Sequence, residues 1–169
     1  MDTNGGVDMN KIHLATEEES QEVYSIFQLY KDIFPHLRYD FLCRKIKSKN
    51  CVLDNGVAIT FTVYKRKNKV GISNTPDGLF SIPLPLYASK GDVIIHQIAN
   101  KEPSNGQSRK IITKFTDNYI GQKIWLVVRQ SNIQAIKFYN KMNFGNVGTI
   151  FWKDGTLPGY VFCLDKRKT

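Results

Sequence analysis

A chain of 169 residues with 41% hydrophobic and 23% charged side chains is long enough, and ordinary enough in composition, to form one globular domain. The mean hydropathy of −0.33 and the lack of any apolar run near the ~20 residues that cross a bilayer argue against a membrane protein. The net charge of +9 exceeds what solubility requires and favours an anionic ligand or macromolecule.

The N-terminal segment and the cysteines indicate a protein of a reducing compartment. Residues 1–10 are acidic and polar and lack the basic and apolar regions of a secretory signal. We therefore expect a flexible tail at 1–10, a single domain at 11–169, and a cytoplasmic location. Cys43, Cys51 and Cys163 show neither a disulfide framework nor metal-ligand spacing, which predicts reduced thiols and no metal site.

The basic residues come in groups along the sequence. A lysine-rich solvated surface explains such groups, and contact with a nucleic acid explains them equally well. Nucleic acid is therefore a candidate partner beside a small substrate. The groups are Arg44, Lys45, Lys47 and Lys49; Lys65, Arg66, Lys67 and Lys69; and Lys166, Arg167 and Lys168.

The first part of the chain predicts a short strand and two helices. Residues 11–15 have the pattern of a strand. Thr16 and the three glutamates after it predict the N-cap and first turn of a helix that Pro35 ends. Residues 38–49 predict a second, short helix with Asp40 as its cap.

The middle of the chain predicts a hairpin, an irregular connection and a central strand. The Asn-Gly pair at 55–56 lies between two apolar runs and predicts a tight β-turn. Residues 68–89 are rich in turn formers and are interpreted as an irregular connection or flap. The nearly continuous apolar run at 92–99 is typical of a strand buried on both faces.

The second half alternates helices with buried strands. A helix is predicted at 107–121, a strand at 123–129 and a last helix at 132–142, followed by two strands joined by the turn at 154–159. The element order β-α-α-β-β-β-α-β-α-β-β predicts an α/β protein. Its mixed, mostly antiparallel central sheet is flanked by helices on both faces.

A strand that runs through a glycine turn directly into a helix is a candidate anion site. The helix after Gly106 offers unpaired N–H groups and the positive end of its dipole, and glycine lets the backbone approach a phosphate closely. Arg109 and Lys110 follow in the first turn of that helix. A purely structural turn would show the same pattern.

The last predicted helix carries a pattern that resembles the GCN5-related N-acetyltransferase (GNAT) superfamily. That family has N-x-x-A-x-x-x-Y, then a small residue and Phe. The matching residues are Asn132, Ala135, Tyr139, Asn143 and Phe144. Residues 92–112 are similar to the family's acetyl-CoA segment in length and register, and the strand at 124–132 looks like the family's approach to this helix.

The phosphate loop departs from the family's Q/R-x-x-G-x-G/A pattern. Pro103, Gly106 and Ser108 stand at the aligned positions, so one glycine and a small last residue remain. Asn143 replaces the usual glycine, and asparagine tolerates the left-handed backbone that a helix end needs. The resemblance still implies that the fold binds coenzyme A.

The resemblance implies acetyl-CoA as co-substrate and assigns roles to residues. Tyr139 would be the general acid that protonates the departing thiolate, and Asn132 would bond to the pantetheine arm or cap its helix. The implied cofactor-binding residues are Ile98, Asn105, Gly106, Gln107, Ser108, Arg109, Asn132 and Ala135.

Two side chains on one strand are candidates for the general base that an attacking amine needs. Asp92 falls at the register where histone-acetylating relatives place a carboxylate, and His96 lies four residues on, on the same face. Imidazole titrates near neutral pH. We expect one of the two to act as base. A turn cap at Asp92 and a histidine bonded to a backbone carbonyl are the structural alternatives.

The resemblance therefore implies an acetyl-CoA-dependent N-acetyltransferase that acts on a primary amine by direct attack, and the net charge of +9 favours an anionic or macromolecular acceptor. The alternatives are a GNAT-like enzyme that modifies a DNA base or tRNA, and a non-catalytic GNAT-fold module that binds nucleic acid. No membrane association is expected, and the protein would be a monomer or homodimer.

Overall fold

The computed structural model describes residues 11–74, 84–152, 155 and 157–168. The tail expected at 1–10 lies outside these residues. Parts of the connection expected at 68–89 and of the turn at 154–159 also lie outside them. No helix in the described part of the chain is long and apolar enough to cross a bilayer.

Eight strands pair in the order β1-β2-β5-β6-β8-β7-β3-β4. The strands are β1 (Cys51–Asp54), β2 (Val57–Val63), β3 (Asn68–Ser73), β4 (Pro85–Ala88), β5 (Val93–Asn100), β6 (Lys123–Arg129), β7 (Gly145–Trp152) and β8 (Leu157–Asp165). The α-helices are α1 (Ser20–Gln28), α2 (Tyr39–Lys47), α3 (Gln107–Thr116) and α4 (Ile133–Lys141). β5 and β6 run parallel, whereas β1–β2, β3–β4, β3–β7, β6–β8 and β7–β8 are antiparallel. The prediction of a mixed, mostly antiparallel sheet is confirmed.

The described chain divides into two compact units. The first unit comprises residues up to 61 and residues 97–120. The second comprises 62–96 and the residues from 121 onward. β5 belongs to the second unit up to His96 and to the first unit from Gln97.

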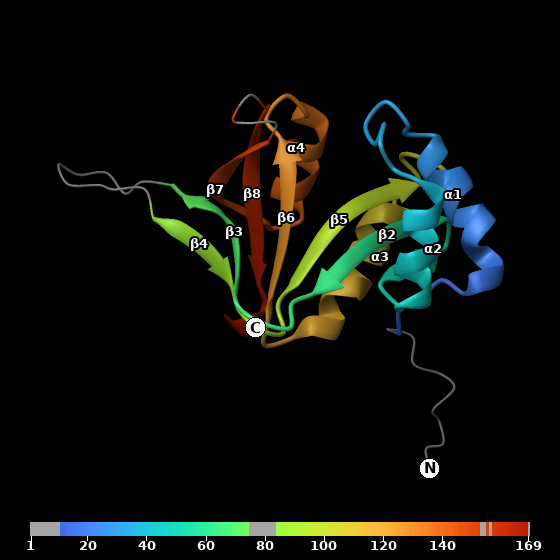
Figure 1. The fold of residues 1–169 in the computed structure, drawn as a ribbon, viewed down its shortest axis with the longest axis horizontal. Coiled ribbons are helices and arrows are strands. Elements are labelled where there is room, and N and C mark those ends of the chain that lie inside the picture. The colour runs from blue at the N-terminus through green and yellow to red at the C-terminus, as the bar shows by residue number, and fades with distance from the viewer. Residues whose placement is uncertain (1–10, 75–83, 153–154, 156, 169) are drawn as a thin grey trace, which may run out of the picture. The chain divides into compact units, whose positions relative to one another are not determined.

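In the first unit, helices cover both faces of the β1–β2 hairpin (Figure 1). The buried residues of α1 and α2 share one core cluster with Leu53 and Ala58. Phe61 instead packs on Phe115 of α3, with ring centroids 4.9 Å apart. Ala58 and Phe61 are three positions apart on one strand, so their side chains point to opposite faces. α3 therefore lies on the face opposite α1 and α2.

In the second unit, α4 packs against β8 through aromatic rings. Tyr139 lies 5.7 Å from Phe144 and 6.4 Å from Phe162, measured between ring centroids. A separate core cluster forms around Trp125 and Val161. The β3–β4 hairpin joins the sheet through β7, where Ile72 pairs with Thr149.

Two expectations for the first part of the chain were wrong in extent. Residues 11–15 form an isolated bridge, Leu14 to Val52, rather than a strand. The first helix ends at Gln28, and turns rather than helix lead to Pro35.

The second helix begins two residues earlier than its expected cap, Asp40, implied. Its N-cap is Arg38, and Asp40 lies in the first turn. There the Asp40 carboxylate meets the positive end of the helix dipole and accepts a hydrogen bond from Arg44 at 3.3 Å.

The described ends of the connection expected at 68–89 are strands rather than irregular. Its described ends form β3 and β4, which pair with each other, with a register shift between Lys69 and Gly71. The alternation of inward and outward side chains in these strands was hard to recognise in the sequence because of this register shift and because of Pro85. Pro85 lies at the first position of an edge strand, where proline is tolerated.

Candidate functional site

The loop between β5 and α3 has the geometry of an anion site. Gly106 is the N-cap of α3 with φ +80°, a conformation that glycine adopts without steric cost. A Cβ atom built on Gly106 would have no other described atom within 4 Å. Residues 101–106 are exposed. The first N–H groups of α3 therefore face an open approach, with Arg109 exposed in the same turn.

Asn100 holds this loop in shape, and the sequence analysis missed it. Its side chain is 6% exposed. Its Oδ1 accepts from the N–H of Glu102 at 3.0 Å, and its Nδ2 lies 3.0 Å from both Asn105 Oδ1 and Ser108 Oγ. Asn105 Oδ1 also accepts from the N–H of Gln107 at 3.0 Å. One buried amide thus connects the start, the turn and the helical end of the loop.

The backbone on either side of Asn100 is tied to other elements of the first unit. The Tyr30 hydroxyl donates to the Asn100 carbonyl oxygen at 2.7 Å. The Lys101 N–H donates to the Gly56 carbonyl oxygen at 2.8 Å. The tight turn of the β1–β2 hairpin therefore supports the loop between β5 and α3.

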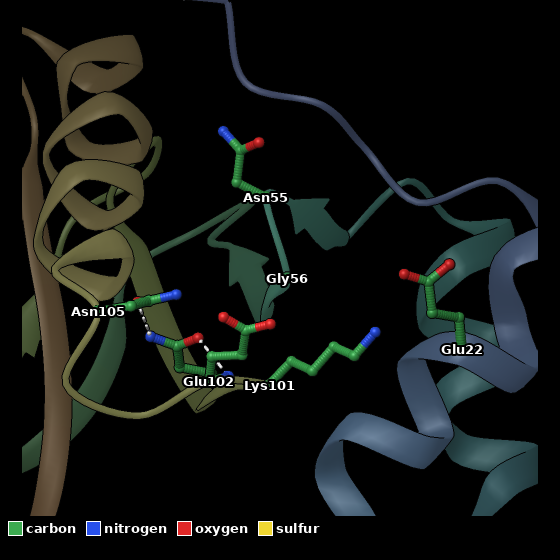
Figure 2. A pocket seen from close by; sticks show the side chains of 7 residues that line it. Glu22, Asn55, Gly56, Lys101, Glu102 and Asn105 are labelled. Atoms are coloured by element: carbon green, nitrogen blue, oxygen red, sulfur yellow. Dashed lines mark hydrogen bonds between the residues drawn. The ribbon is translucent and has the colours of Figure 1, made fainter.

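A polar cavity of about 230 Å³ adjoins this loop in the first unit (Figure 2). Glu22 comes to it from α1, whereas Lys101, Glu102 and Asn105 come from the loop. Both acidic and basic groups line the cavity, so its charge by itself selects no ligand class. The lining residues are Glu22, Asn55, Gly56, Asn100, Lys101, Glu102 and Asn105.

In the second unit, α4 begins and ends as its sequence pattern predicts. Asn132 is the N-cap, and its Oδ1 accepts from the N–H of Ala135 at 3.2 Å. Asn143 has φ +68° just after the helix, and the N–H of Phe144 donates to the Tyr139 carbonyl oxygen at 3.1 Å. The left-handed residue that the family pattern supplies as glycine is supplied here by asparagine.

Tyr139 lies in an aromatic cluster with its hydroxyl available. Its ring packs against Phe138, Phe144 and Phe162. Among the described residues, the hydroxyl has no hydrogen-bond partner. Burial raises the pKa of Tyr139 above its ordinary value, although the side chain keeps some exposed surface. The phenol therefore stays protonated at neutral pH and can donate.

Asp92 is a structural anchor at the start of β5. The residue is 3% exposed. Its Oδ2 accepts from the N–H of Ser89 at 2.8 Å and from Trp125 Nε1 at 3.1 Å, and its Oδ1 accepts from the N–H of Lys123 at 3.0 Å. These contacts realise the turn-cap interpretation. They engage both carboxylate oxygens.

His96 is exposed, and its Nε2 lies 2.8 Å from the Thr62 hydroxyl. Strand register relates it to Tyr139. Phe162, which contacts Tyr139, pairs with Leu126, and Leu126 pairs with Ile95. Measured along β5, His96 therefore lies within one residue of the level of Tyr139. Asp92 lies about 10 Å from that level, just before the start of β5.

The other expected site residues are divided between the two units. Ile98 is partly buried on β5 in the first unit, together with the loop residues from Asn105 to Arg109. Asn132 and Ala135 lie in the second unit with Asp92, His96 and Tyr139. The signal that could have revealed Asn100 is a polar residue ending an apolar strand just before a glycine turn. Among the described residues, no group of His, Cys, Asp or Glu could hold a metal ion.

Comparisons with known proteins agree at the level of structure. No family model and no curated protein matches the sequence. A GNAT-family acetyltransferase from Bacillus cereus matches with a TM-score of 0.62 at 15% identity, over 92% of this chain and 96% of that one. One from Streptococcus agalactiae gives 0.65 at 10%, over 93% and 95%. NAA60 of Arabidopsis thaliana in complex with acetyl-CoA gives 0.60 at 16%, over 92% and 98%.

Sequence identities this low show similarity of fold alone. Each match covers nearly the whole of both chains. In this chain the mixed eight-stranded sheet, the glycine turn before α3 and the asparagine-capped α4 agree with the expectation from sequence. This chain therefore has the GNAT acyl-CoA N-acyltransferase fold.

Proposed function

We propose that this protein transfers the acetyl group of acetyl-CoA to a primary amine. The observation that carries the proposal is the phosphate loop, which Asn100 holds open in front of the α3 N-terminus. Solved structures of the same fold include NAA60 in complex with acetyl-CoA, which supports the choice of donor. When bound, acetyl-CoA supplies the activated thioester.

The loop residues fit a pyrophosphate. The N–H of Gln107 already donates to Asn105 Oδ1, so the N–H groups that follow it at the start of α3 are the ones that would bond to phosphate oxygens, and Arg109 adds a positive charge. Ser108 replaces a glycine of the family pattern, and its hydroxyl is 3.0 Å from Asn100 Nδ2. The serine side chain is thus turned toward the buried amide, which leaves the backbone as the binding element.

Tyr139 is the proposed general acid. When the amine nitrogen forms its bond to the acetyl carbon and the carbon–sulfur bond breaks, Tyr139 donates its proton to the sulfur. A hydroxyl that has no hydrogen-bond partner in the described part of the chain, and that lies in a cluster of aromatic rings, is suited to that step. Asn132 keeps its helix-capping role and orients the turn that precedes Tyr139.

His96 is the proposed general base, rather than Asp92. It is exposed and near the level of Tyr139, whereas Asp92 accepts three hydrogen bonds in a buried turn. Ile95 shares a face of the sheet with Leu126 and Phe162, and Tyr139 packs on Phe162. His96 follows Ile95 on β5 and points to the opposite face. The proposed base and the proposed acid therefore approach from different faces of the sheet. An attacking amine and a departing sulfur also occupy different positions around the acetyl carbon. The net charge of +9 favours an anionic or macromolecular acceptor.

The test is calorimetric titration of the purified protein with acetyl-CoA, followed by thiol release in the presence of a panel of primary amines. We expect acetyl-CoA binding and amine-dependent release of free thiol. Tyr139→Phe should retain binding and lower kcat by about 10²-fold or more. His96→Gln should lower kcat, whereas Asp92→Asn should act chiefly on stability.

The contrary outcomes are distinct. A protein that binds no acetyl-CoA lacks the proposed activity altogether. A protein that binds acetyl-CoA but turns over at the same rate after Tyr139→Phe uses another acid. Full activity of His96→Gln, with loss of activity in a folded Asp92→Asn variant, would return the base to Asp92.

A further inference from the structure

The ends of several strands in the second unit gather in one place. The N–H of Tyr64 donates to the Asp92 carbonyl oxygen, and the N–H of Gly91 donates to the Tyr64 carbonyl oxygen, both at 2.8 Å. These bonds join the turn after β2 to the turn before β5. The N–H of Lys123 donates to Asp92 Oδ1, which adds the start of β6.

The end of β8 and the β3–β4 hairpin lie at the same end. Lys123 pairs with Asp165, and the N–H of Lys166 donates to the Gln122 carbonyl oxygen at 2.9 Å. Lys69 at the start of β3 pairs with Tyr87 near the end of β4. Figure 1 shows these strand ends meeting beside the C-terminus.

Basic residues dominate this end of the unit, which we call the basic end. Those in the turns and at the start of β3 are exposed, namely Lys65, Arg66, Lys67, Lys69 and Lys90. The full set is Lys65, Arg66, Lys67, Lys69, Lys90, Lys123, Lys166 and Arg167. Segments that lie far apart in the sequence thus contribute charge to one surface.

The acidic residues here offset little of that charge at the surface. Asp92 is 3% exposed and engaged with three N–H donors. Asp165 pairs with Arg167, with Oδ2 2.8 Å from Nη2, and that hydrogen bonding lowers the pKa of Asp165. The cations of the two turns and of β3 therefore produce a local positive potential.

An aromatic side chain lies among these cations. Tyr87 is 45% exposed, and the Lys67 ammonium lies 4.3 Å from its ring centroid. Exposed rings interleaved with lysines are typical of surfaces that combine phosphate contacts with base stacking. Neither turn, at 65–67 or at 89–91, carries an aliphatic side chain that could enter a lipid layer.

We propose that the basic end binds the phosphate backbone of a nucleic acid. Within the second unit it lies at the start of β6, whereas α4 follows the other end of that strand, about 20 Å away. Nucleic-acid binding and acetyl transfer would thus use different parts of the unit. The proposal does not depend on the proposed enzymatic activity.

The test is fluorescence anisotropy with a labelled single strand and a duplex of about 20 nucleotides, over a range of salt concentrations. Vesicles containing anionic lipid serve as a competing polyanion. The variant Lys65→Gln/Arg66→Gln/Lys67→Gln removes three charges from the basic end. The matched control Arg44→Gln/Lys47→Gln/Lys49→Gln removes three exposed charges from the first unit.

We expect salt-sensitive binding of at least one oligonucleotide at about micromolar Kd in low salt. The basic-end variant should bind about tenfold or more weakly and lose about two to three units of the log–log salt slope, while the control stays close to the wild type. Equal losses in the two variants would show that net charge, not this surface, binds. No oligonucleotide binding, or tighter binding to the vesicles, would also overturn the proposal. Acetyl-CoA binding should be unchanged in both variants.

Discussion

Replacing Asn100 with alanine tests whether one buried amide organises the phosphate loop. The substitution removes the hydrogen bonds to the Glu102 N–H, Asn105 Oδ1 and Ser108 Oγ, each 3.0 Å long. Each such bond contributes about 1 kcal/mol net. The Glu102 N–H lies in an exposed loop and can bind water instead. The expected loss is therefore about 2 kcal/mol, below the stability of an ordinary domain.

Two measurements follow from that estimate. The melting temperature should fall by about 4–8 °C, as about 2 kcal/mol implies for a chain of this size. If the loop is the pyrophosphate site, acetyl-CoA should also bind about tenfold more weakly. In the variant, binding would have to order the loop, at a free-energy cost of about 1.4 kcal/mol. Ser108→Ala removes only the bond to Ser108 Oγ and should have about half of the effect on stability.

The two readouts separate the two parts of the reasoning. An Asn100→Ala protein as stable as the wild type would refute the account of the hydrogen-bond network. A destabilised protein that binds acetyl-CoA with unchanged affinity would refute the assignment of the loop to the pyrophosphate. Asn100→Asp keeps the acceptor for Glu102 but places a negative charge beside the loop, so it should weaken acetyl-CoA binding more than it lowers stability.

Three further predictions concern stability and reactivity. The Thr16 N–H bonds to Glu19 and lowers the pKa of that carboxyl below its ordinary value of 4.5, so Glu19→Ala should cost about 1 kcal/mol at neutral pH. The stability difference between Glu19→Ala and the wild type should be fully present above pH 4.5 and should vanish as the pH falls through the folded-state pKa of Glu19. A stability difference that stays the same in acid denaturation would contradict this role of Glu19. Burial raises the pKa of Cys51 to about 12, so its alkylation near pH 8 should be slow until the protein is denatured, and fast labelling of the native protein would show that the thiol is accessible. A Cβ atom on Gly148 would collide with a carbonyl oxygen of β3, whereas one on Gly145 of the same strand meets its nearest neighbour at 3.9 Å. Gly148→Ala should therefore destabilise the protein by about 1–3 kcal/mol and Gly145→Ala much less, and equal denaturation midpoints would argue against that packing.

Local chemistry in the sequence was sufficient for the starts of the helices and the turns that bear on the site, whereas the helix expected at 107–121 ends at Thr116 and continues as a 3-10 turn at Asp117–Tyr119. The Asn-Gly pair at 55–56 adopts positive φ at both positions, as a tight hairpin turn requires. Asn132 caps α4, and Gly106 begins α3 with a left-handed backbone. Each of these features depends on a residue and its near neighbours, so the sequence pattern contains the physical cause.

The assignment of roles needed contacts between distant segments. Asp92 and His96 look alike as candidates in the sequence, and only the donors around each separate them. One of these, Trp125 Nε1, is 33 residues from Asp92. Strand register, which links His96 to the level of Tyr139, is likewise set by pairing between β5, β6 and β8.

By itself, the sequence determined the fold class, the glycine turn before α3 and the pattern of α4, because hydrophobic period, capping and turn chemistry act over a few residues. The tertiary structure alone decided that the described ends of 68–89 form strands, that Asn100 supports the loop between β5 and α3, and that dispersed lysines share one surface. These features depend on backbone pairing and on buried donors and acceptors that are contributed by segments far apart in the chain. No local pattern specifies which distant partner satisfies a buried polar group.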